Sequence, residues 1–372
     1  MMKNKVLMTG NEAIGEAALR AGCSFYAGYP ITPQNELTAY LSRQMDKHGG
    51  VFIQAESELS AISMVLGAAA VGSRAMTSSS SPGISLKQEG ISYLAGCELP
   101  CVIVNIMRGG PGLGNIAPSQ SDYFQATKGG GHGDYHCIVL APSSVQEAFD
   151  MMFSAFELAD EYRNPVMLLG DGMLGQMMEP LIVHGPRSTV HRKKRNGLST
   201  KKWALSGCKG RQPNIIKSFY MQEGKLEEFN IKLQKKYEEI KNRLQQWEGL
   251  FLDDAEVVLV AYGTMARIAR SVVKRLRQEG KKIGLIRPIT LWPFPKKAFT
   301  PFKKSSTNRR NAQASRADNL SKAKRFVVLE MSYGQMVEDV KLVLEGKAVV
   351  DFFGRSGGGM PTEEEIIKKV KL

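Results

Sequence analysis

The stretch YPITP at residues 29–33, with ESE at 56–58 and MRGG at 107–110, decides how the first part of this chain folds. Each stretch comes directly after a short apolar run, and longer amphipathic segments separate the runs. Alternating strands and helices predict a parallel sheet with helices on both faces. Ligands bind such a sheet at the carboxyl ends of its strands, so the hydroxyl, carboxylate and guanidinium of these stretches are expected at one edge.

The alternation extends over the first part of the chain, where apolar runs predict strands and three- or four-residue spacing predicts helices. The predicted strands lie at 6–8, 24–28, 51–54, 75–77, 102–106, 138–140 and 166–169. The predicted helices lie at 13–21, 33–47, 59–70, 84–95 and 145–162. We expect residues 1–185 to form one α/β domain.

The rest of the chain is expected to form a connecting segment and a smaller α/β domain. Residues 186–252 begin as a basic, polar linker and continue into an amphipathic helix from about 225 to 247. Residues 253–372 predict strands at 257–261, 283–286, 326–330 and 349–353, with helices at 265–279 and 334–344. The proline-rich stretch 287–295 is interpreted as a stiff connector, because proline blocks helices and central strands.

The formal charge of +14 is concentrated in two segments. Residues 181–222 contain ten Lys or Arg and no acid, and residues 302–325 contain eight against one acid. The remaining chain is therefore close to neutral. Because aromatic residues for base stacking are almost absent from both segments, we interpret them as solvated loops, and 302–325 as an insertion. A non-catalytic nucleic-acid-binding protein that uses the basic linker is the less favoured alternative.

Cysteine usage and hydropathy exclude other classes. The five cysteines include no C-x-x-C pair, which argues against a disulfide framework and against a cluster or zinc site made by this chain alone. No apolar run is long enough to span a bilayer, and no export signal is visible. We expect a cytoplasmic protein that does not insert into membranes.

Three residues suit a 2-oxo acid and a cofactor that needs a proton moved. Glu58 begins a helix after a strand, with Ser57 as a possible cap, and its carboxylate can face a cofactor ring nitrogen; an ordinary helix-terminal acid is the alternative. Arg108 enters a glycine-rich loop without the Lys-Ser/Thr of a phosphate loop, so it fits a bidentate carboxylate clamp. Thr32 supplies a hydroxyl at the same edge.

Two other patterns look like metal sites. Gly170-Asp171-Gly172 resembles the start of a metal-diphosphate motif, but Asn196 at the matching distance falls in the basic linker, so we expect an ordinary strand-ending turn. His132 and His136 are four residues apart, but the glycines around them disfavour a helix, so loop positions near the cleft are expected. We predict no metal ligand in this chain.

With these residues in view, the chain resembles the α subunit of the 2-oxoacid:ferredoxin oxidoreductases. Within that family it most resembles the large subunit of the 2-ketoisovalerate (3-methyl-2-oxobutanoate) enzyme. The resemblance covers nearly the whole chain. It runs through YPITP at 29–33, QAESE at 54–58, SPGISLKQEGISYLAG at 81–96, MRGGPGLGN at 107–115, KGGGHGDY at 128–135, LAPSSVQEAFD at 140–150, VAYGTMARIARS at 260–271, IRPITLWPFP at 286–295 and EMSYGQMVEDV at 330–340.

The resemblance implies a pyrimidine-binding thiamine diphosphate domain followed by a transketolase C-terminal-like domain. It implies that Glu58 hydrogen-bonds the aminopyrimidine ring, with Tyr29 and Pro30 at the same cofactor, and that Thr32 and Arg108 hold the oxo acid. The implied reaction is the oxidative decarboxylation of 3-methyl-2-oxobutanoate to its acyl-CoA, with reduction of ferredoxin.

The resemblance also implies partners. Thiamine diphosphate would be shared with a β subunit that binds its diphosphate, and magnesium and iron-sulfur clusters would lie on companion subunits. A γ subunit and a ferredoxin-like subunit would complete the assembly. A 2-oxoglutarate:ferredoxin oxidoreductase α subunit is the alternative of the same class, since 2-oxoglutarate needs a second cation where a branched substrate needs an apolar pocket.

Overall fold

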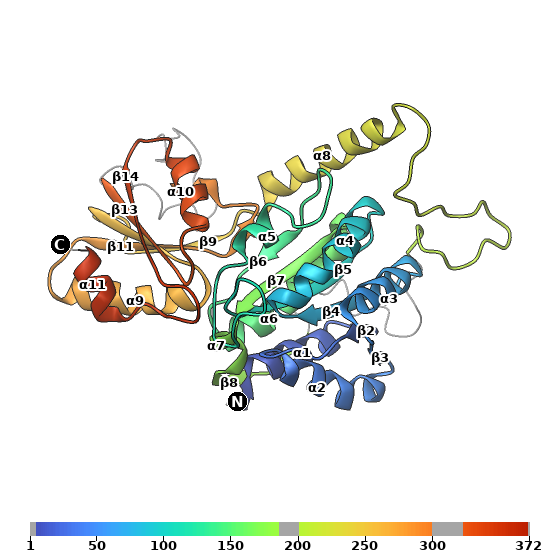
Figure 1. Ribbon diagram of the computed structural model, residues 1–372, viewed down its shortest axis with the longest axis horizontal. Coiled ribbons are helices and arrows are strands. Elements are labelled where there is room, and N and C mark those ends of the chain that lie inside the picture. Colours follow the sequence, from blue (N-terminus) through green and yellow to red (C-terminus); the bar gives the residue numbers. More distant parts are fainter. Residues whose placement is uncertain (1–4, 186–200, 300–322, 371–372) are drawn as a thin grey trace.

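The computed structural model describes residues 5–185, 201–299 and 323–370, and within them the strands form three sheets (Figure 1). A seven-stranded and a five-stranded sheet are the centres of two α/β bodies that lie side by side. Asn196 and nearly all of the predicted insertion 302–325 lie outside the described residues.

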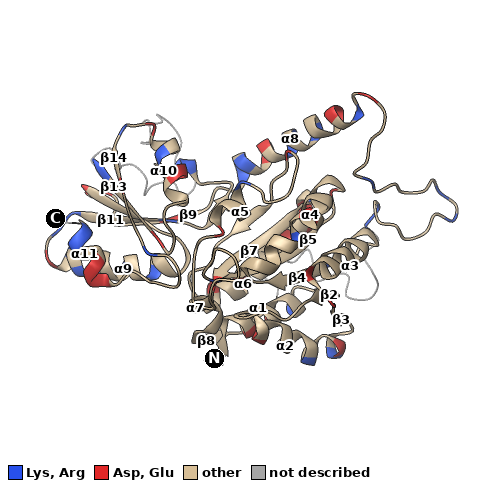
Figure 2. Cartoon of the chain, viewed as in Figure 1, with Lys and Arg blue, Asp and Glu red and all other residues tan. Residues whose placement is uncertain are grey.

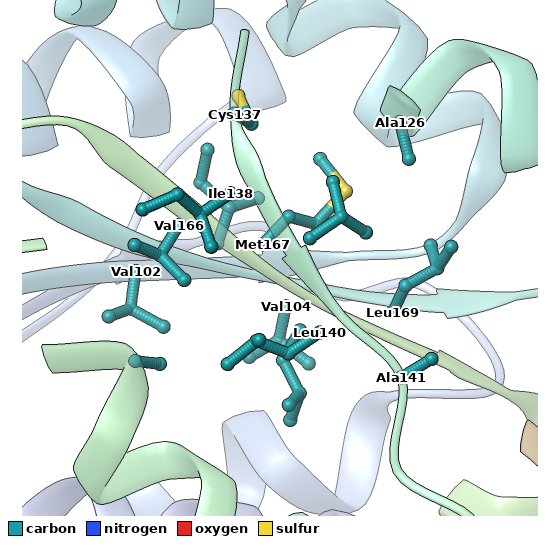
Figure 3. Close-up of a cluster of buried hydrophobic side chains, with 14 of the residues drawn as sticks. Val102, Val104, Ala126, Cys137, Ile138, Leu140, Ala141, Val166, Met167 and Leu169 are labelled. Atoms are coloured by element: carbon teal, nitrogen blue, oxygen red, sulfur yellow. The ribbon is translucent and has the colours of Figure 1, made fainter. Parts of the chain in front are cut away.

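The seven-stranded sheet has the order β12-β6-β7-β5-β4-β2-β3. All neighbours are parallel except β12, which runs antiparallel to β6. Every residue of β4, β5, β6 and β7 is buried, as expected for a sheet covered on both faces. Figure 3 shows the apolar side chains packed around β5, β6 and β7. The strands are β2 (Phe25–Gly28), β3 (Val51–Gln54), β4 (Ala75–Ser79), β5 (Cys101–Met107), β6 (Ile138–Leu140), β7 (Pro165–Asp171) and β12 (Thr290–Trp292).

Helices cover this sheet. α3 (Glu58–Ala70) packs on α4 (Ser81–Gly96). In addition, α3 packs on β2 and β4, and α4 packs on β5. α1 (Gly10–Arg20) packs on α6 (Val145–Tyr162), which lies against β5 and β7. The hydroxyls of Thr9, Ser57 and Ser144 cap α1, α3 and α6, so side-chain oxygens fix these three starting points. The shorter helices are α2 (Asn35–Gln44), α5 (Tyr123–Thr127) and α7 (Gly172–Gln176), with a 3-10 turn at Asp46–His48.

The five-stranded sheet has the order β14-β13-β10-β11-β9, and only β9 is antiparallel to its neighbour. The segment 201–224 and α8 (Lys225–Arg243) lead into it, and acidic and basic residues alternate with uncharged ones along α8 (Figure 2). Its strands are β9 (Trp247–Leu250), β10 (Val257–Val260), β11 (Ile283–Pro288), β13 (Arg325–Glu330) and β14 (Val349–Gly354). Its helices are α9 (Gly263–Gln278), α10 (Met336–Leu344) and α11 (Glu363–Val370), with a 3-10 turn at Lys296–Phe299.

Buried polar contacts join the two bodies. The Gln120 backbone N–H donates to the Met331 carbonyl at 2.9 Å, and its side-chain amide donates to the Tyr262 carbonyl at 3.0 Å. The Met331 N–H donates back to Gln120 Oε1 at 3.1 Å. Arg287 of β11 is buried and forms two hydrogen bonds to the Glu147 carboxylate of α6, at 2.6 and 2.8 Å. Since β12 also adds to the first sheet, the second body is held firmly against the first.

The predicted strand at 6–8 exists but is not part of the main sheet. β1 (Lys5–Thr9) pairs antiparallel with β8 (Met178–Ile182), a strand that the sequence pattern did not predict. Most of β1 is exposed, whereas central strands of a parallel sheet are buried on both faces. Membership of β1 in the parallel sheet was therefore a wrong prediction.

Two boundaries in the second half also differ. The long helix ends at Arg243 instead of 247, and Trp247 begins β9. The stretch 287–295 was predicted as a connector, but Thr290–Trp292 forms β12. An edge strand needs ladder hydrogen bonds on one side only, so the flanking prolines Pro288 and Pro293 do not prevent it. The domain boundaries at 185 and 252 stay predictions.

Among the described residues, no helix combines the length and apolar character needed to cross a membrane.

Candidate active site

The strand order changes direction between β2 and β4. From β2 the chain moves outward to β3, and from β4 it moves the other way to β5. In open α/β sheets ligands bind at the carboxyl ends of the strands beside such a switch point. The loop 29–34 after β2 and the first turn of α4 after β4 therefore border the expected position, with Glu58 after β3 and Arg108 after β5.

Glu58 is the first residue of α3 and is only 6% exposed. The Ser57 hydroxyl accepts a hydrogen bond from the Ser60 N–H at 3.2 Å, which fixes the start of the helix. No group among the described residues donates a hydrogen bond to the Glu58 carboxylate. A buried carboxylate without hydrogen bonds is costly, so this group is a candidate contact for a ligand.

Gly83, in the first turn of α4, makes room for Glu58. A β-carbon at this position would lie 2.5 Å from Glu58 Oε1 and 2.0 Å from Ser79 Oγ. Both distances are far shorter than van der Waals contact. The Glu58 carboxylate therefore occupies space that only a glycine at position 83 leaves open.

Lys87 lies one turn further along α4, and its side chain is fully buried. Its ammonium donates one hydrogen bond, to the backbone carbonyl of Glu58 at 3.3 Å. Burial lowers the pKa of Lys87 to about 8, and the charge of Glu58 opposes that shift. A cation thus lies behind the carboxylate at the start of α3.

Arg108 and Thr32 are in direct contact. The Arg108 side chain donates from Nη1 to the Thr32 carbonyl and from Nη2 to the Leu113 carbonyl, each at 3.0 Å. The residue is 7% exposed, and its buried Nε has no partner in the described part of the chain. The Thr32 hydroxyl accepts from the Asn35 amide at 3.2 Å, and its own hydrogen has no acceptor among the described residues.

Ser81 links Arg108 to α4. Its hydroxyl accepts from the Arg108 N–H at 3.0 Å and donates to the Asp122 carboxylate at 2.6 Å. Asp122 also accepts from the Asn105 amide at 2.9 Å. Burial raises the pKa of the Asp122 carboxyl, and these hydrogen bonds oppose the rise. The first turn of α4 therefore touches both Glu58 and Arg108.

Several buried polar atoms at this edge have no hydrogen-bond partner within residues 5–185, 201–299 and 323–370. They are the hydroxyls of Ser79, the last residue of β4, and of Ser80, which follows it, the side-chain oxygen of Asn105 on β5 and the Nε of Arg108. Buried polar groups in proteins are nearly always paired, so a group of unpaired ones beside a free carboxylate indicates a binding site. These atoms can donate hydrogen bonds to a polar ligand and accept hydrogen bonds from it, and Arg108 adds a positive charge that suits an anionic group.

Tyr29 and Pro30 lie on the exposed part of the loop after β2. Other apolar side chains near Glu58 and Arg108 are exposed too: Leu59 follows Glu58, and Leu113, whose carbonyl binds Arg108, is 81% exposed. Leu86 on α4 is also exposed. The site is thus bordered by apolar surface, which often marks a protein interface.

The residues of the two patterns that resembled metal sites make hydrogen bonds and packing contacts within the fold. Asp171 caps α7, accepting from the Met173 and Leu174 N–H groups at 3.0 and 3.1 Å, and accepts from the Thr264 hydroxyl at 2.9 Å. The strand thus ends at Asp171 as predicted, but it leads directly into α7 instead of an ordinary turn. No group of three His, Cys, Asp or Glu side chains that could hold a metal occurs in the described ranges.

His132 and His136 lie in a loop, as predicted. His136 stacks on Trp292 of β12 with ring centroids 4.4 Å apart and lies edge-on to Tyr237 of α8. Burial lowers the pKa of His136 to about 4. The two ring contacts place His136 between α8 and β12, and not among the loops of the switch point.

Sequence reasoning missed Ser81, Gly83, Lys87 and Asp122. The first three belong to the stretch SPGISLK at 81–87, which supported the family resemblance without a chemical role for any residue. A glycine in the first turn of a helix was the one available signal of close approach. Asp122 offers no sequence signal, because its contact with Ser81 depends on the tertiary fold.

Comparisons with known proteins agree with this architecture. The family described as "Pyruvate flavodoxin/ferredoxin oxidoreductase, thiamine diP-bdg" matches residues 16–248. The family described as "Pyruvate:ferredoxin oxidoreductase core domain II" matches residues 255–308.

Full-length relatives share both parts. The "Ketoisovalerate oxidoreductase subunit VorB" of Methanothermobacter thermautotrophicus is 47% identical over 365 residues, covering 98% of this chain and 97% of that protein. The "2-oxoglutarate synthase subunit KorA" of Methanocaldococcus jannaschii is 36% identical over 381 residues, covering 98% of each. A solved structure of the 2-oxoglutarate:ferredoxin oxidoreductase from Magnetococcus marinus matches with a TM-score of 0.81 and 26% identity, covering 99% of this chain and 65% of that one.

The predicted fold class is confirmed by these matches and by the two α/β bodies. The chain therefore belongs to the 2-oxoacid:ferredoxin oxidoreductase family, with that family's thiamine-diphosphate-binding domain followed by its core domain II.

Proposed function

We propose that the chain is a catalytic subunit of an oxidoreductase that decarboxylates 3-methyl-2-oxobutanoate (2-ketoisovalerate) to its acyl-CoA and reduces ferredoxin. The observation that carries this proposal is the unpaired, buried Glu58 carboxylate at the switch point of a thiamine-diphosphate-binding domain. The choice of substrate is supported by the higher identity to the ketoisovalerate relative, 47% against 36% for the 2-oxoglutarate relative.

The residues at the switch point fit the pyrimidine end of thiamine diphosphate. Glu58 is unpaired, Gly83 leaves its carboxylate free, and Ser79 and Ser80 have hydroxyls without partners. Glu58, Tyr29 and Pro30 would contact the cofactor. When bound, thiamine diphosphate supplies an electron sink for the loss of carbon dioxide from a 2-oxo acid.

Glu58 has the position of a proton-exchanging group. One carboxylate oxygen would form a hydrogen bond with a ring nitrogen of the cofactor and hold the proton between them. Because the group is buried, water does not compete for this hydrogen bond, which strengthens it. The Ser57 cap and the buried α3–α4 contact keep the carboxylate in one orientation.

Arg108 and Thr32 would hold the oxo acid. Two of the five guanidinium N–H groups bind backbone carbonyls, which orients the plane and leaves the others, Nε included, for a carboxylate. The Thr32 hydroxyl has a hydrogen left to donate to an oxo or carboxylate oxygen. Both residues would therefore bind and orient the substrate.

We also propose that partner subunits complete the site. The apolar residues Tyr29, Leu59, Leu86 and Leu113 around it support an interface with a β subunit that binds the diphosphate. Magnesium and iron-sulfur clusters on companion chains, a γ subunit, a ferredoxin-like subunit and coenzyme A as acyl acceptor follow from the family. A cytoplasmic location is supported by the cysteines, which are all free thiols.

Glu58→Gln in the assembled enzyme tests the proposal. The amide cannot exchange the proton, so oxo-acid-dependent reduction of a low-potential dye is expected to fall by about 10²- to 10⁴-fold. Assembly with the partner chains, followed by size-exclusion chromatography, should stay unchanged. Turnover like that of the wild type would remove Glu58 from the mechanism.

A panel of oxo acids tests the substrate. We expect kcat/KM for 3-methyl-2-oxobutanoate to exceed that for 2-oxoglutarate by at least about tenfold, or about 1.4 kcal/mol. The reverse order would favour the 2-oxoglutarate alternative.

A further inference from the structure

Lys87 is a buried cation that the proposed mechanism does not use. It lies on the face of α4 that packs against α3, between two glycines, Gly83 and Gly90. A β-carbon at Gly90 would lie 2.6 Å from both γ-carbons of Ile62 on α3, so the two helices approach closely. This close packing encloses the lysine side chain, whose exposed fraction is 0%.

The hydrogen bonding of Lys87 is incomplete. An ammonium has three N–H donors, and only the 3.3 Å bond to the Glu58 carbonyl is made among the described residues. No ion pair within 4.0 Å joins Lys87 to the Glu58 carboxylate, although the negative charge of Glu58 acts on the lysine. A fully buried charge without an ion pair is costly, so a structural role alone does not explain its presence.

We propose that Lys87 is a positioning residue that balances the charge of Glu58 without occupying its carboxylate. The bond to the Glu58 carbonyl holds the first turn of α3, and the positive charge offsets the carboxylate from behind. A direct salt bridge would do the same but would compete with the cofactor for the carboxylate oxygens. This inference rests on the proposed role of Glu58.

The other charged groups on the elements around α4 have partners elsewhere, so we infer that Lys87 acts on Glu58. Asp122 binds Ser81 at the start of α4, Arg108 beyond β5 binds backbone carbonyls, and Asp171 at the end of β7 caps α7. Within the described residues, Glu58 is the charged group whose charge raises the pKa of Lys87, against the lowering by burial.

The titration of Lys87 gives the proposal a pH signature. Its pKa, lowered by burial to about 8, means that the positive charge is present at neutral pH and is lost as the pH rises through that value. The CoA-independent half-reaction, oxo acid plus a low-potential dye, should therefore slow above pH 8. Leaving out coenzyme A removes the titration of its thiol from the profile.

The test compares Lys87→Met and Lys87→Arg in the assembled enzyme. Lys87→Met removes the charge at nearly constant volume, and we expect the half-reaction to fall by about 10- to 100-fold at pH 7 and to lose its alkaline inflection. Its thermal stability should change little, because the loss of a costly buried charge is offset by the loss of the hydrogen bond to the Glu58 carbonyl and of the charge that balances Glu58. Lys87→Arg stays charged, so it should retain most of the pH 7 rate and keep it above pH 8.

A matched control is Lys236→Met on α8. Lys236 is mostly buried, with 13% of its side chain exposed and its pKa lowered by burial, but it bonds to Glu98 and to the Arg163 carbonyl, away from the site. This variant should keep the wild-type pH profile.

The outcomes separate the two proposals. If Lys87→Met or Lys87→Arg shows the alkaline inflection of the wild type, or if the wild type has none, the role of Lys87 is overturned. If Lys87→Met fails to assemble, the profile of Lys87→Arg against the wild type decides. An active Glu58→Gln enzyme would refute the proposed function independently of Lys87.

Discussion

Gly83→Ala is the substitution for which the structure gives the sharpest expectation. The new β-carbon would lie 2.5 Å from Glu58 Oε1 and 2.0 Å from Ser79 Oγ. Ordinary contact begins at 3.4 Å, so the carboxylate oxygen must move by about 1 Å. Both obstructing atoms end side chains that can rotate, so the backbone need not shift.

The consequence is a selective loss of activity. A misplacement of about 1 Å in a catalytic group can cost about 10²-fold in rate, which corresponds to about 2.7 kcal/mol of activation free energy. The free energy of unfolding should change little. A helical alanine is favoured over glycine by about 0.5–1 kcal/mol, and the displaced rotamers cost about as much.

The assay is dye reduction by the assembled enzyme with saturating oxo acid, beside thermal unfolding of the same preparation. Gly67→Ala on α3 is the matched control, because no heavy atom lies within 4 Å of a β-carbon there. It should stabilise the protein by about 0.5–1 kcal/mol and leave kcat unchanged. If Gly83→Ala kept the wild-type kcat, the Glu58 carboxylate would not need the space that position 83 leaves.

Three further outcomes are expected. Arg108→Lys keeps the charge but loses the planar fork, so KM for the oxo acid should rise by about 10- to 100-fold with assembly intact; an unchanged KM would place the substrate carboxylate elsewhere. Gln120→Leu leaves the Met331 N–H unpaired, and urea unfolding should show a loss of about 2–4 kcal/mol. Burial alone would raise the pKa of the Glu147 carboxyl, but the nearby Arg287 lowers it below its usual value. The Glu147 carboxylate therefore stabilises the fold at pH values above its unfolded pKa, and this stabilisation decreases as the pH falls. The Tm of Glu147→Gln should therefore lie below that of the wild type at pH 7, and the gap should close below about pH 4.

The sequence was sufficient for the parts of the fold that local patterns determine. Fully buried strands such as β5 and β7 are apolar runs, and a cap residue such as Ser57 marks a helix start without tertiary information. The edge at which Thr32, Glu58 and Arg108 gather followed from the alternation alone. Their roles in binding and catalysis stay predictions.

The remaining features depend on contacts between segments far apart in the chain. β12 is a three-residue edge strand beside prolines, and its partner β6 lies about 150 residues earlier, so no local pattern predicts the pair. The burial of Lys87 could not be predicted for another reason, because a lysine on a helix normally indicates the face exposed to solvent. Only the glycines on either side of it, at 83 and 90, indicated a close helix contact.

The first turns of α4 explain why so many functional groups depend on so short a stretch. Ser81 holds Arg108 and Asp122, Gly83 gives space to the Glu58 carboxylate, and Lys87 binds the carbonyl of the same residue. The proposed acid and the proposed substrate clamp follow different strands, so neither could hold the other directly. The helix α4, which starts at the switch point, contacts both residues. As a rigid element it therefore fixes the distance between Glu58 and Arg108. Shifts of α4 should therefore change kcat and KM together, whereas Gly83→Ala, which displaces the Glu58 carboxylate and the Ser79 hydroxyl but not Arg108, should lower kcat and leave KM near its wild-type value.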